Sequence, residues 1–362
     1  MKFTINVKEL EKKLTVLSKI VASNNVFPIL SNFLFVVKGN DLTLTSSDSE
    51  ITVITKTELA DVEGEGNFTC PVKMILDLLK EVNDEYLSFE IDGNHVSMES
   101  LKGRYAFMSM DANEFPSVPS MLSVKEILVP YTTFKQGIAR TIFAVSEDQL
   151  RPVVTGVYIE TVGDVIGFTA TDQYKISWVI GNHLLRDEVG FIISSKTANL
   201  LNTLPNKAIT NVGIEVSAVN AKFEVGEYVV YARLIDGSYP PFRSVIPKGE
   251  MKTVSTSKKE LLGAIKRAAV FSNSKNGIIK LSVGKALVIS SNDVDDKKSS
   301  KETIACVYNG EPMDIGFNKT FLIEVISNIE SDDVIMSITK PCNPILFNYE
   351  HIKLILIPLM LN

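Results

Sequence analysis

Residues 3–22 read FTINVKELEKKLTVLSKIVA, a short strand pattern that runs directly into an amphipathic helix pattern. Apolar side chains recur at Leu10, Leu14, Leu17 and Val21, the spacing that places them on one face of a helix. A helix with one apolar face needs a sheet or another helix to pack against. This opening therefore favours an α+β fold.

The same strand-and-helix pattern returns twice, and each copy is followed by two predicted strands. The three copies begin at Phe3, Glu126 and Lys252. After the strand pair, an aspartate follows in LTSSDSEITV, FTATDQYKISWV and ISSNDVDDKK, at Asp48, Asp172 and Asp293, and a second helix pattern follows in VKMILDLLKEV, SKTANLLNTL and NKTFLIEVISNI. Repetition at a period of about 120 residues predicts three homologous domains, each with two helices packed on antiparallel sheet.

Two proline-rich stretches mark places where a domain can end. They read EFPSVPS at residues 114–120 and SYPPFRSVIPK at residues 238–248. Proline is excluded from helix interiors and from central strands, so such stretches suit connections. We predict an N-terminal domain at residues 1–121, a central domain at 125–249 and a C-terminal domain at 250–362.

The composition indicates a folded protein, because 45% of the residues are hydrophobic and 22% are charged. A chain of 362 residues is too long for one ordinary domain. Cys70, Cys306 and Cys342 are widely spaced and odd in number, which is typical of reduced thiols. The first residues show no apolar stretch of a signal peptide. We therefore expect a soluble, cytoplasmic protein.

No sequence motif indicates a catalytic site. The three histidines, His95, His183 and His351, lie far apart, and none belongs to a metal-binding pair. The acidic run at 292–296 lacks the central glycine and final glutamate of a calcium loop. We expect no catalytic residue, no metal site and no cofactor. The alternative, an enzyme that uses a cleft between domains, would need a site that the sequence does not display.

Positive charge concentrates on the predicted helices. They contain fifteen Lys and Arg residues and seven Asp and Glu residues, whereas the whole chain carries a formal net charge of −6. Glutamate forms helices as readily as lysine, so helix propensity alone would leave the helices balanced. The segregation predicts a shared helix face that meets a polyanion. It also argues against a repeat-built scaffold or adhesin without a nucleic-acid role.

Several short motifs, taken with the threefold repeat, resemble the bacterial sliding clamps, the beta subunits of DNA polymerase III. The resemblance extends along essentially the whole chain. Its clearest features are the opening MKFT, Phe27-Pro28-Ile29-Leu30, Arg151 with Gly156, Thr169-Ala170-Thr171-Asp172, Leu234-Ile235-Asp236-Gly237 with Tyr239-Pro240, Val245-Ile246-Pro247-Lys248, Ile315-Gly316-Phe317-Asn318 and Pro358-Leu359-Met360-Leu361.

The resemblance implies a head-to-tail homodimer that closes into a ring of six similar domains, with helices inside and sheets outside. Duplex DNA would pass through the ring and be held through its phosphates without being read in sequence. The protein would be a non-catalytic processivity factor of the polymerase III holoenzyme. The implied partners are duplex DNA, the replicative polymerase, the clamp loader, other proteins with a clamp-binding motif and a second copy of the chain.

Three sets of site residues follow from the resemblance and from the helix charge. A groove for partner peptides between the second and third domains would be formed by Val154, Thr171, Tyr174, Lys175, Ile176, Pro240, Ser244, Val245, Asn318, Phe321, Pro344, Ile355, Ile357, Pro358, Leu359 and Met360. The residues facing DNA would be Lys12, Lys13, Lys73, Lys135, Arg140, Lys196, Lys259, Lys266 and Lys319.

The third set is the contact between two copies. By resemblance it joins Lys102, Arg104 and Tyr105 of one copy to Val270 and Phe271 of the other. A phenylalanine at the exposed end of an amphipathic helix needs a cover. The alternative is that Phe271 packs within its own domain.

The predicted groove departs from the family pattern. Residues 173–176 read Gln-Tyr-Lys-Ile where members commonly have Gly-His-Arg-Leu, and Ser244 and Met360 stand where arginine is common. We expect a more apolar and less basic groove, which leaves its preferred peptide motif open. Pro358 has no N–H for a sheet ladder, so we expect residues 359–362 to leave the sheet and expose apolar surface.

Overall fold

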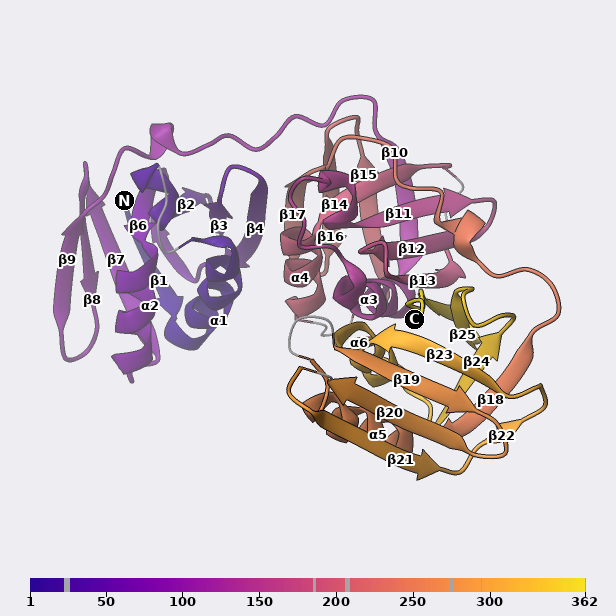
Figure 1. The fold of residues 1–362 in the computed structure, drawn as a ribbon. Coiled ribbons are helices and arrows are strands. Elements are labelled where there is room, and N and C mark those ends of the chain that lie inside the picture. The colour runs from indigo at the N-terminus through magenta and orange to yellow at the C-terminus, as the bar shows by residue number, and fades with distance from the viewer. Residues whose placement is uncertain (23–26, 185–186, 206–208, 274–276, 294, 362) are drawn as a thin grey trace. The chain divides into compact units, whose positions relative to one another are not determined.

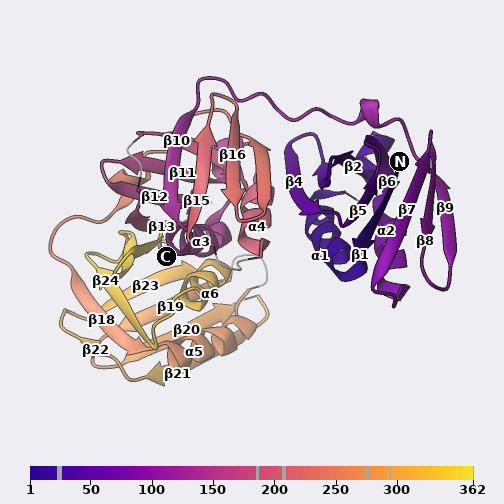
Figure 2. The ribbon, with the colours of Figure 1, turned by 180° about the vertical axis from the view of Figure 1, so that it is seen from behind.

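The computed structural model describes residues 1–22, 27–184, 187–205, 209–273, 277–293 and 295–361. Short helices alternate with antiparallel strands (Figures 1 and 2), which confirms the predicted α+β class. None of the described helices combines the length and the apolar character of a membrane span. Within the same ranges, His, Cys, Asp and Glu side chains form no cluster of three or more that could hold a metal ion.

The first repeat begins with a strand that runs straight into a helix, as predicted. Its helices are α1 (Val7–Leu17) and α2 (Val72–Glu81). Its strands are β1 (Lys2–Asn6), β2 (Asn32–Lys38), β3 (Asp41–Ser47), β4 (Ile51–Glu58), β5 (Asp61–Glu63), β6 (Gly66–Pro71), β7 (Tyr86–Asp92), β8 (His95–Glu99) and β9 (Arg104–Met108).

The second repeat follows the same order. Its helices are α3 (Tyr131–Thr141) and α4 (Ser195–Thr203). Its strands are β10 (Lys125–Pro130), β11 (Gly156–Val162), β12 (Val165–Thr171), β13 (Lys175–Asn182), β14 (Gly190–Ser194), β15 (Asn211–Val216), β16 (Asn220–Val225) and β17 (Tyr228–Arg233).

The third repeat completes the series. Its helices are α5 (Lys258–Val270) and α6 (Lys319–Ser327). Its strands are β18 (Lys252–Ser257), β19 (Ile278–Val283), β20 (Leu287–Asp293), β21 (Lys298–Ile304), β22 (Val307–Tyr308), β23 (Met313–Asn318), β24 (Asp333–Ile338), β25 (Ile345–Tyr349) and β26 (Ile352–Leu356).

A polar residue marks the point where a strand becomes a helix. Asn6 before α1, Ser194 before α4, Ser257 before α5 and Asn318 before α6 each accept a hydrogen bond from a backbone N–H of the first helical turn. These N-caps satisfy amides that have no partner inside the helix. The local sequence therefore fixes where these strands end and these helices begin.

The three repeated aspartates shape the hairpins after each strand pair. Oδ1 of Asp48 accepts a hydrogen bond from the N–H of Ile51 (2.6 Å), and Oδ1 of Asp172 accepts one from the N–H of Lys175 (2.8 Å). Oδ1 of Asp293 accepts one from the N–H three residues on (3.3 Å). Bonds of this kind stabilise turns, so the aspartates have a structural role in the repeat.

Each repeat contains two sheets, and sheets of neighbouring repeats join edge to edge. β4 pairs antiparallel with β17, which creates an eight-stranded sheet in the order β10-β15-β16-β17-β4-β3-β2-β6. In the same way β13 pairs antiparallel with β26, and the sheet continues through β25, β24, β18 and β22. Two smaller sheets remain, with the orders β5-β1-β7-β8-β9 and β21-β20-β19-β23.

The chain divides into two compact units, residues 1–134 with 183–235 and residues 135–182 with 236–362. The second repeat is shared between the units, because one of its sheets continues into the first repeat and part of the other continues into the third. This division follows the joined sheets rather than the sequence repeats.

Each unit has its own apolar core. In the first unit, the Phe3 ring stacks on Phe89 and the Phe35 ring stacks on Phe68, both with centroids 4.8 Å apart. In the second unit, α5 and α6 lie side by side against the strands of the third repeat, and their apolar faces are fully buried (Figure 1). Aromatic pairs and a continuous aliphatic cluster stabilise the two units through burial.

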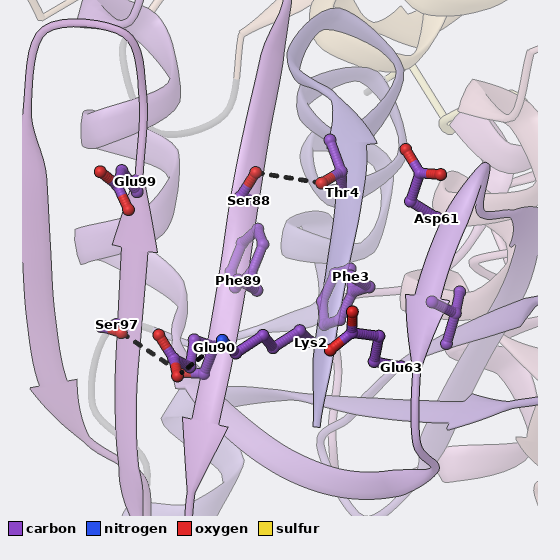
Figure 3. A pocket seen from close by; sticks show the side chains of 11 residues that line it. Lys2, Phe3, Thr4, Asp61, Glu63, Ser88, Phe89, Glu90, Ser97 and Glu99 are labelled. Carbon is purple, nitrogen blue, oxygen red and sulfur yellow. Dashed lines mark hydrogen bonds and ion pairs between the residues drawn. The ribbon is translucent and has the colours of Figure 1, made fainter.

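Figure 3 shows a shallow pocket of about 270 Å³ over β5, β1 and β7. Asp61, Glu63 and Glu90 contribute carboxylates to it, and the Nζ of Lys2 lies 3.2 Å from Oε1 of Glu90. The pocket belongs to the five-stranded sheet of the first repeat, and none of the predicted site residues lines it. We assign no ligand to it.

Candidate interaction surfaces

The predicted groove residues gather around the hairpin that joins β12 to β13. Thr171 ends β12, Tyr174 lies in the turn and Ile176 belongs to β13. The pairing of β13 with β26 places Ile176 opposite Ile355. The backbone N–H of Ile357 then donates to the carbonyl of Tyr174 at 2.9 Å. The second and third repeats therefore stay paired beyond the end of β26.

The apolar floor of this region is deeply buried. Val154, Ile176 and Ile355 are only 2%, 3% and 0% exposed. Ile176 and Ile355 pack with Phe242 and Leu346 in one cluster. These side chains are enclosed, and their place in the lining of a partner groove stays a prediction. They support the surface from beneath.

Lys175 is buried between two carboxylates. Its Nζ lies 2.5 Å from Oδ2 of Asp172 and 2.8 Å from Oε2 of Glu324. An unpaired ammonium in such a place would be strongly destabilising, and two acidic partners offset that penalty. Lys175 therefore neutralises the carboxylates of Asp172 and Glu324, and its own charge is not available to a partner. This agrees with the expectation of a less basic groove.

An aromatic pair lies over this ion network. The ring of Tyr174 stacks on the ring of Phe321 in α6, with centroids 5.1 Å apart and planes 16° apart. The Nζ of Lys175 lies 4.8 Å from the centroid of the same Phe321 ring. Tyr174 is exposed. The departure from the family pattern thus provides an accessible aromatic face where the second repeat meets the third.

Residues 236–251, which connect the second and third repeats, pack across β11 and β13. Tyr239 stacks on Tyr158 with centroids 4.8 Å apart, and Phe242 packs edge-on to Trp178 at 5.4 Å. Burial raises the pKa of the Tyr239 hydroxyl. This segment, which contains the predicted groove residues Pro240, Ser244 and Val245, is therefore fixed by aromatic packing.

Arg243 is the basic residue beside the exposed Ser244. Its guanidinium donates to Oε2 of Glu160 at 3.2 Å and lies 5.2 Å from the Trp178 ring centroid. Glu160 is buried, so this pairing also satisfies a carboxylate inside the sheet. The arginine nearest to position 244 is therefore engaged with the sheet.

The C-terminal tail departs from the prediction in one respect. β26 ends at Leu356, before Pro358, as expected. Leu359 nevertheless donates its N–H to the carbonyl of Gly316 in β23 at 2.8 Å and forms a single antiparallel bridge with it. Leu359 therefore leaves the sheet of β26, as predicted, and bridges to a different sheet, which the prediction did not include.

The physical reason lies in Gly316. A Cβ at this position would lie 2.7 Å from Cδ2 of Leu361 and 3.0 Å from the carbonyl oxygen of Leu359, so only glycine lets the tail lie so close. The next residue, Met360, is 84% exposed. The tail thus presents apolar surface while remaining attached to β23. Asn362 lies outside the described residues.

The remaining predicted groove residues lie at the start of α6 and beside the tail. Asn318 caps α6 through its side chain, with Oδ1 accepting from the N–H of Thr320 at 2.9 Å. Pro344 directly precedes β25 and is half-buried. Asn318 is therefore committed to the helix N-terminus.

All of the basic residues predicted to face DNA lie on helices. Within the described ranges, Lys73 on α2 and both Lys259 and Lys266 on α5 are exposed and take part in no ion pair. Lys135 on α3 is half-buried. Lys319 on α6 donates to the carbonyl of Asn273 at 3.3 Å. Lys207, which we counted with the helices, lies outside the described residues.

Three other predicted residues pair with acids of the neighbouring repeat. The Nζ of Lys12 lies 3.5 Å from Oε1 of Glu227. Lys196 on α4 pairs with Asp48. Arg140 on α3 pairs with Glu330, and burial lowers the pKa of its guanidinium. These residues have a structural partner in addition to any partner in solution.

Lys13 is the one clear error in this set. Its side chain is buried, and its Nζ donates to the carbonyl of Lys56 at 2.9 Å and to Oε2 of Glu227. Burial alone would raise the pKa of Glu227, but the hydrogen bonds and charges of Lys13 and Lys12 outweigh it and lower that pKa. Lys13 therefore joins the first repeat to the second and does not face DNA.

The residues predicted to join two copies lie at β9 and at the end of α5. Lys102 precedes β9, and Arg104 and Tyr105 belong to it; all three are exposed. Val270 ends α5 and is 74% exposed, and Phe271 is 43% exposed. Phe271 is therefore not enclosed by its own repeat.

Sequence reasoning missed the acids that pair with the helix lysines. Glu227 lies in the two-residue turn between β16 and β17, and Glu330 follows α6. The turn itself is readable, because Gly226 has a φ of 61° as tight hairpins require. Lys13, which pairs with Glu227, is far from it in the sequence, so no local pattern identifies the pair.

Comparison with known proteins agrees with the threefold repeat. The family models of the DNA polymerase III beta subunit match the chain with the N-terminal domain at residues 1–119, the central domain at 128–241 and the C-terminal domain at 243–353. The chain belongs to the DNA polymerase III beta subunit family.

Curated relatives and solved structures support the same family. The beta sliding clamp of Synechocystis sp. is 27% identical over 96% of this chain and 95% of its own. That of Proteus mirabilis is 28% identical over 94% and 93%. The DNA polymerase III subunit beta of Pseudomonas aeruginosa covers both chains completely, with a TM-score of 0.95 and 25% identity. A second structure from that organism, also at 0.95, is a sliding clamp bound to griselimycin. The resemblance inferred from the sequence motifs is confirmed.

Proposed function

We propose that two copies of this sliding clamp close head to tail into a ring around duplex DNA. The ring tethers the replicative polymerase, the clamp loader and other proteins with a clamp-binding motif through a peptide groove. Its building blocks are the three domains at residues 1–121, 125–249 and 250–362. The protein catalyses no reaction in this proposal, because holding DNA by topology needs no chemistry.

The observation that carries the proposal is a junction that occurs twice within the chain. In the first two repeats the third strand of one sheet, β4 or β13, pairs antiparallel with the last strand of the following repeat, β17 or β26. The registers correspond, because Thr52 pairs with Tyr231 and Ile176 pairs with Ile355 at equivalent points after the hairpin turn.

The third repeat has the equivalent strand, β21, and the first repeat has the equivalent last strand, β9. Within the described residues both lie at the edge of their sheets. An open edge strand offers N–H and C=O groups for pairing with another chain. If β9 of one copy pairs with β21 of another, the junction forms a third time. Two such contacts related by twofold symmetry close a dimer without leaving either edge open.

Apolar and charged side chains beside these edges support the same contact. Val270 and Phe271 end the helix that packs on β20 and β21, and Tyr105 and Met108 are exposed on β9. On α5, the Nη2 of Arg267 pairs with Oε2 of Glu302 in β21 at 2.6 Å. An apolar centre with charged neighbours is the usual composition of a specific interface.

Contact with DNA would come from exposed helix lysines. Lys73, Lys259 and Lys266 lie on helices of the first and third repeats and are free of ion pairs in the described part of the chain. Lysines that meet phosphates release counterions and read no base sequence, which suits a protein that slides. The net charge of −6 disfavours non-specific binding elsewhere on the surface.

The salt dependence of DNA binding tests this part of the proposal. In the variant with Lys73→Gln, Lys259→Gln and Lys266→Gln, the log–log slope of affinity against salt should fall by ~0.9 for each lost phosphate contact. Fluorescence anisotropy with a nicked circular DNA measures the slope. The control is Lys38→Gln, Lys248→Gln and Lys340→Gln, which removes the same charge from exposed strand and loop positions. Equal slopes in both variants would show that the helix lysines are an ordinary solvated face.

Accessible apolar groups support a peptide groove where β13 meets the tail. Tyr174 stacks on Phe321, its backbone carbonyl accepts from the N–H of Ile357, and Met360, three residues further along the tail, is exposed. Apolar surface with a few fixed polar groups is what anchor side chains of a peptide need. The sliding clamp from P. aeruginosa bound to griselimycin shows that a member of the family holds a ligand.

A further inference from the structure

The segment that follows the last strand of the first repeat crosses back over a sheet of the same repeat. After β9, the N–H of Met110 donates to Oγ1 of Thr69 in β6 at 3.0 Å. Phe115 then packs in a small apolar cluster with Leu34 of β2. This face of the first repeat is therefore covered by the chain's own connection.

In the second repeat, too, the segment after the last strand crosses back over a sheet of the same repeat. After β17, the N–H of Ile235 donates to the carbonyl of Ile192 in β14 at 2.9 Å. Further along the same connection, Tyr239 stacks on Tyr158 of β11 and Phe242 packs on Trp178. Two connections with unrelated sequences thus begin with a hydrogen bond to the same strand of the repeat. Both then bring aromatic rings onto the neighbouring strand.

In the third repeat the tail forms the equivalent hydrogen bond to the strand before the helix. The described tail residues bring no aromatic ring onto the neighbouring strand. Leu359 bonds to Gly316, which lies two residues before the helix cap, as Thr69 and Ile192 do. Beyond Gly316 the sheet face is hollowed into an open depression with a volume of about 1160 Å³. The described tail residues Leu359, Met360 and Leu361 form one wall of this depression.

The side chains on the floor differ in character from those of the other repeats. Lys280 pairs with Ser290, and Ser290 pairs with Lys301, so these three residues form one row across β19, β20 and β21. The equivalent row in the second repeat is Tyr158, Thr169 and Trp178. We call Lys280, Ser290 and Lys301 the basic row. The two positions that carry covered aromatic rings in the second repeat carry lysines here.

The charges of the basic row are only partly matched. The Nζ of Lys280 lies 3.2 Å from Oδ2 of Asp314, and both side chains are largely exposed. Lys301 is exposed and takes part in no ion pair within the described residues. Carboxylates match the charge of such a floor, and a charge-assisted hydrogen bond to a lysine is stronger than a neutral one.

We propose that the basic row and the tail wall bind an extended, acidic segment of a partner protein. The segment is extended because the corresponding faces of the first two repeats carry extended connections. It is acidic because two lysines replace the aromatic positions. The segment adjoins the peptide groove, because Leu359 and Met360 belong to both surfaces. The inference therefore rests on the proposed groove. It predicts that acidic residues flank the groove-binding motif in the partner's sequence.

Calorimetry with the full-length protein tests the inference with defined peptides. The probes are a short Leu/Phe-bearing peptide and two longer versions that carry Glu-Asp-Glu-Asp before or after it. Matched peptides carry Gln-Asn-Gln-Asn. One acidic version should bind about tenfold more tightly than its neutral match at low salt, since exposed ion pairs each add a fraction of that gain. The gain should shrink as salt rises.

Two variants show which lysine is responsible for the increase in affinity for the acidic peptide. Lys301→Gln should abolish it and leave the short peptide unaffected. Lys298→Gln removes the same charge from the same strand, but Lys298 lies outside the depression and pairs with Asp296, so the gain should persist. Equal binding of acidic and neutral peptides, or a gain that survives Lys301→Gln, would overturn the inference.

A further titration separates this inference from the groove itself. The acidic tetrapeptide alone should shift the NMR amide signals of Ser290 and Lys301. If it does so while the short peptide does not bind, the groove is wrong and the acidic site stands. If the short peptide binds and the tetrapeptide leaves both signals unmoved, the acidic site is wrong and the groove stands.

Discussion

A chain in which Val270 and Phe271 are both replaced by aspartate is expected to be a monomer. In the proposed ring these side chains are covered by β9 of the other copy, and each of the two contacts carries both changes. A carboxylate left unpaired in a desolvated contact costs about 3–5 kcal/mol. Both contacts must therefore fail together. Size-exclusion chromatography with light scattering should give the mass of one chain across the micromolar range.

A matched variant separates this effect from a general change in surface charge. Val307 on β22 is 75% exposed, like Val270, and lies outside the proposed contact. Val307→Asp should leave the dimer intact. Circular dichroism should show that both variants keep the fold, because both positions are exposed. A double variant that remains dimeric would refute the assignment of this interface.

Removal of Leu359 to Asn362 is expected to abolish binding of a Leu/Phe-bearing clamp-binding peptide. The deletion removes the exposed Met360, and the groove then loses one wall. It also removes the bridge from Leu359 to Gly316, which leaves the backbone of β23 without that partner. Burial of an anchor side chain supplies about 1.5–3 kcal/mol, so a groove without its wall should lose at least tenfold in affinity. Calorimetry with the truncated chain measures this.

The truncated chain should remain dimeric, because the tail bridges to β23, which lies at the opposite edge of its sheet from β21, the strand of the proposed contact. The control is Leu184→Ala, which removes an exposed apolar side chain elsewhere and should not change peptide affinity. Undiminished peptide binding by the truncated dimer would show that the groove has been assigned to the wrong place.

The repeat and the fold class could be predicted because their signals are local. The strand that runs into α1, the polar cap at Asn6 and the apolar spacing of the helix all lie within residues 3–22. The same signals recur at α5, where Ser257 is the cap. Local patterns of this kind specify elements before any distant contact forms.

The errors concern contacts between residues that are distant in sequence. Lys13 has the same chemistry as Lys12, but it lies three residues after Leu10 and therefore on the apolar face of the helix. Only the folded chain shows that its partners there are Glu227 and Lys56. The tail is similar. Pro358 correctly indicates that β26 has ended, but the bridge of Leu359 to Gly316 depends on a glycine 43 positions earlier whose role is invisible without the fold.

The sheet junctions were the least predictable feature of the chain. Each repeat was expected to fold around its own sheets, whereas β4 pairs with β17 and β13 pairs with β26. Edge pairing depends on backbone groups that every residue carries, so the sequence of an edge strand holds little information about its neighbour. The structure supplies this pairing, and with it the argument for the ring.

Retention on closed DNA tests the central claim most directly. The protein is bound to nicked circular DNA, passed through a sizing column at moderate salt, and followed in the DNA fraction before and after the circle is cut once. A ring should stay with the circle and be lost from the linear form, whereas the double aspartate variant should be retained on neither. Equal retention on circular and linear DNA would contradict the account, because only a protein that encircles the duplex responds to the presence of ends.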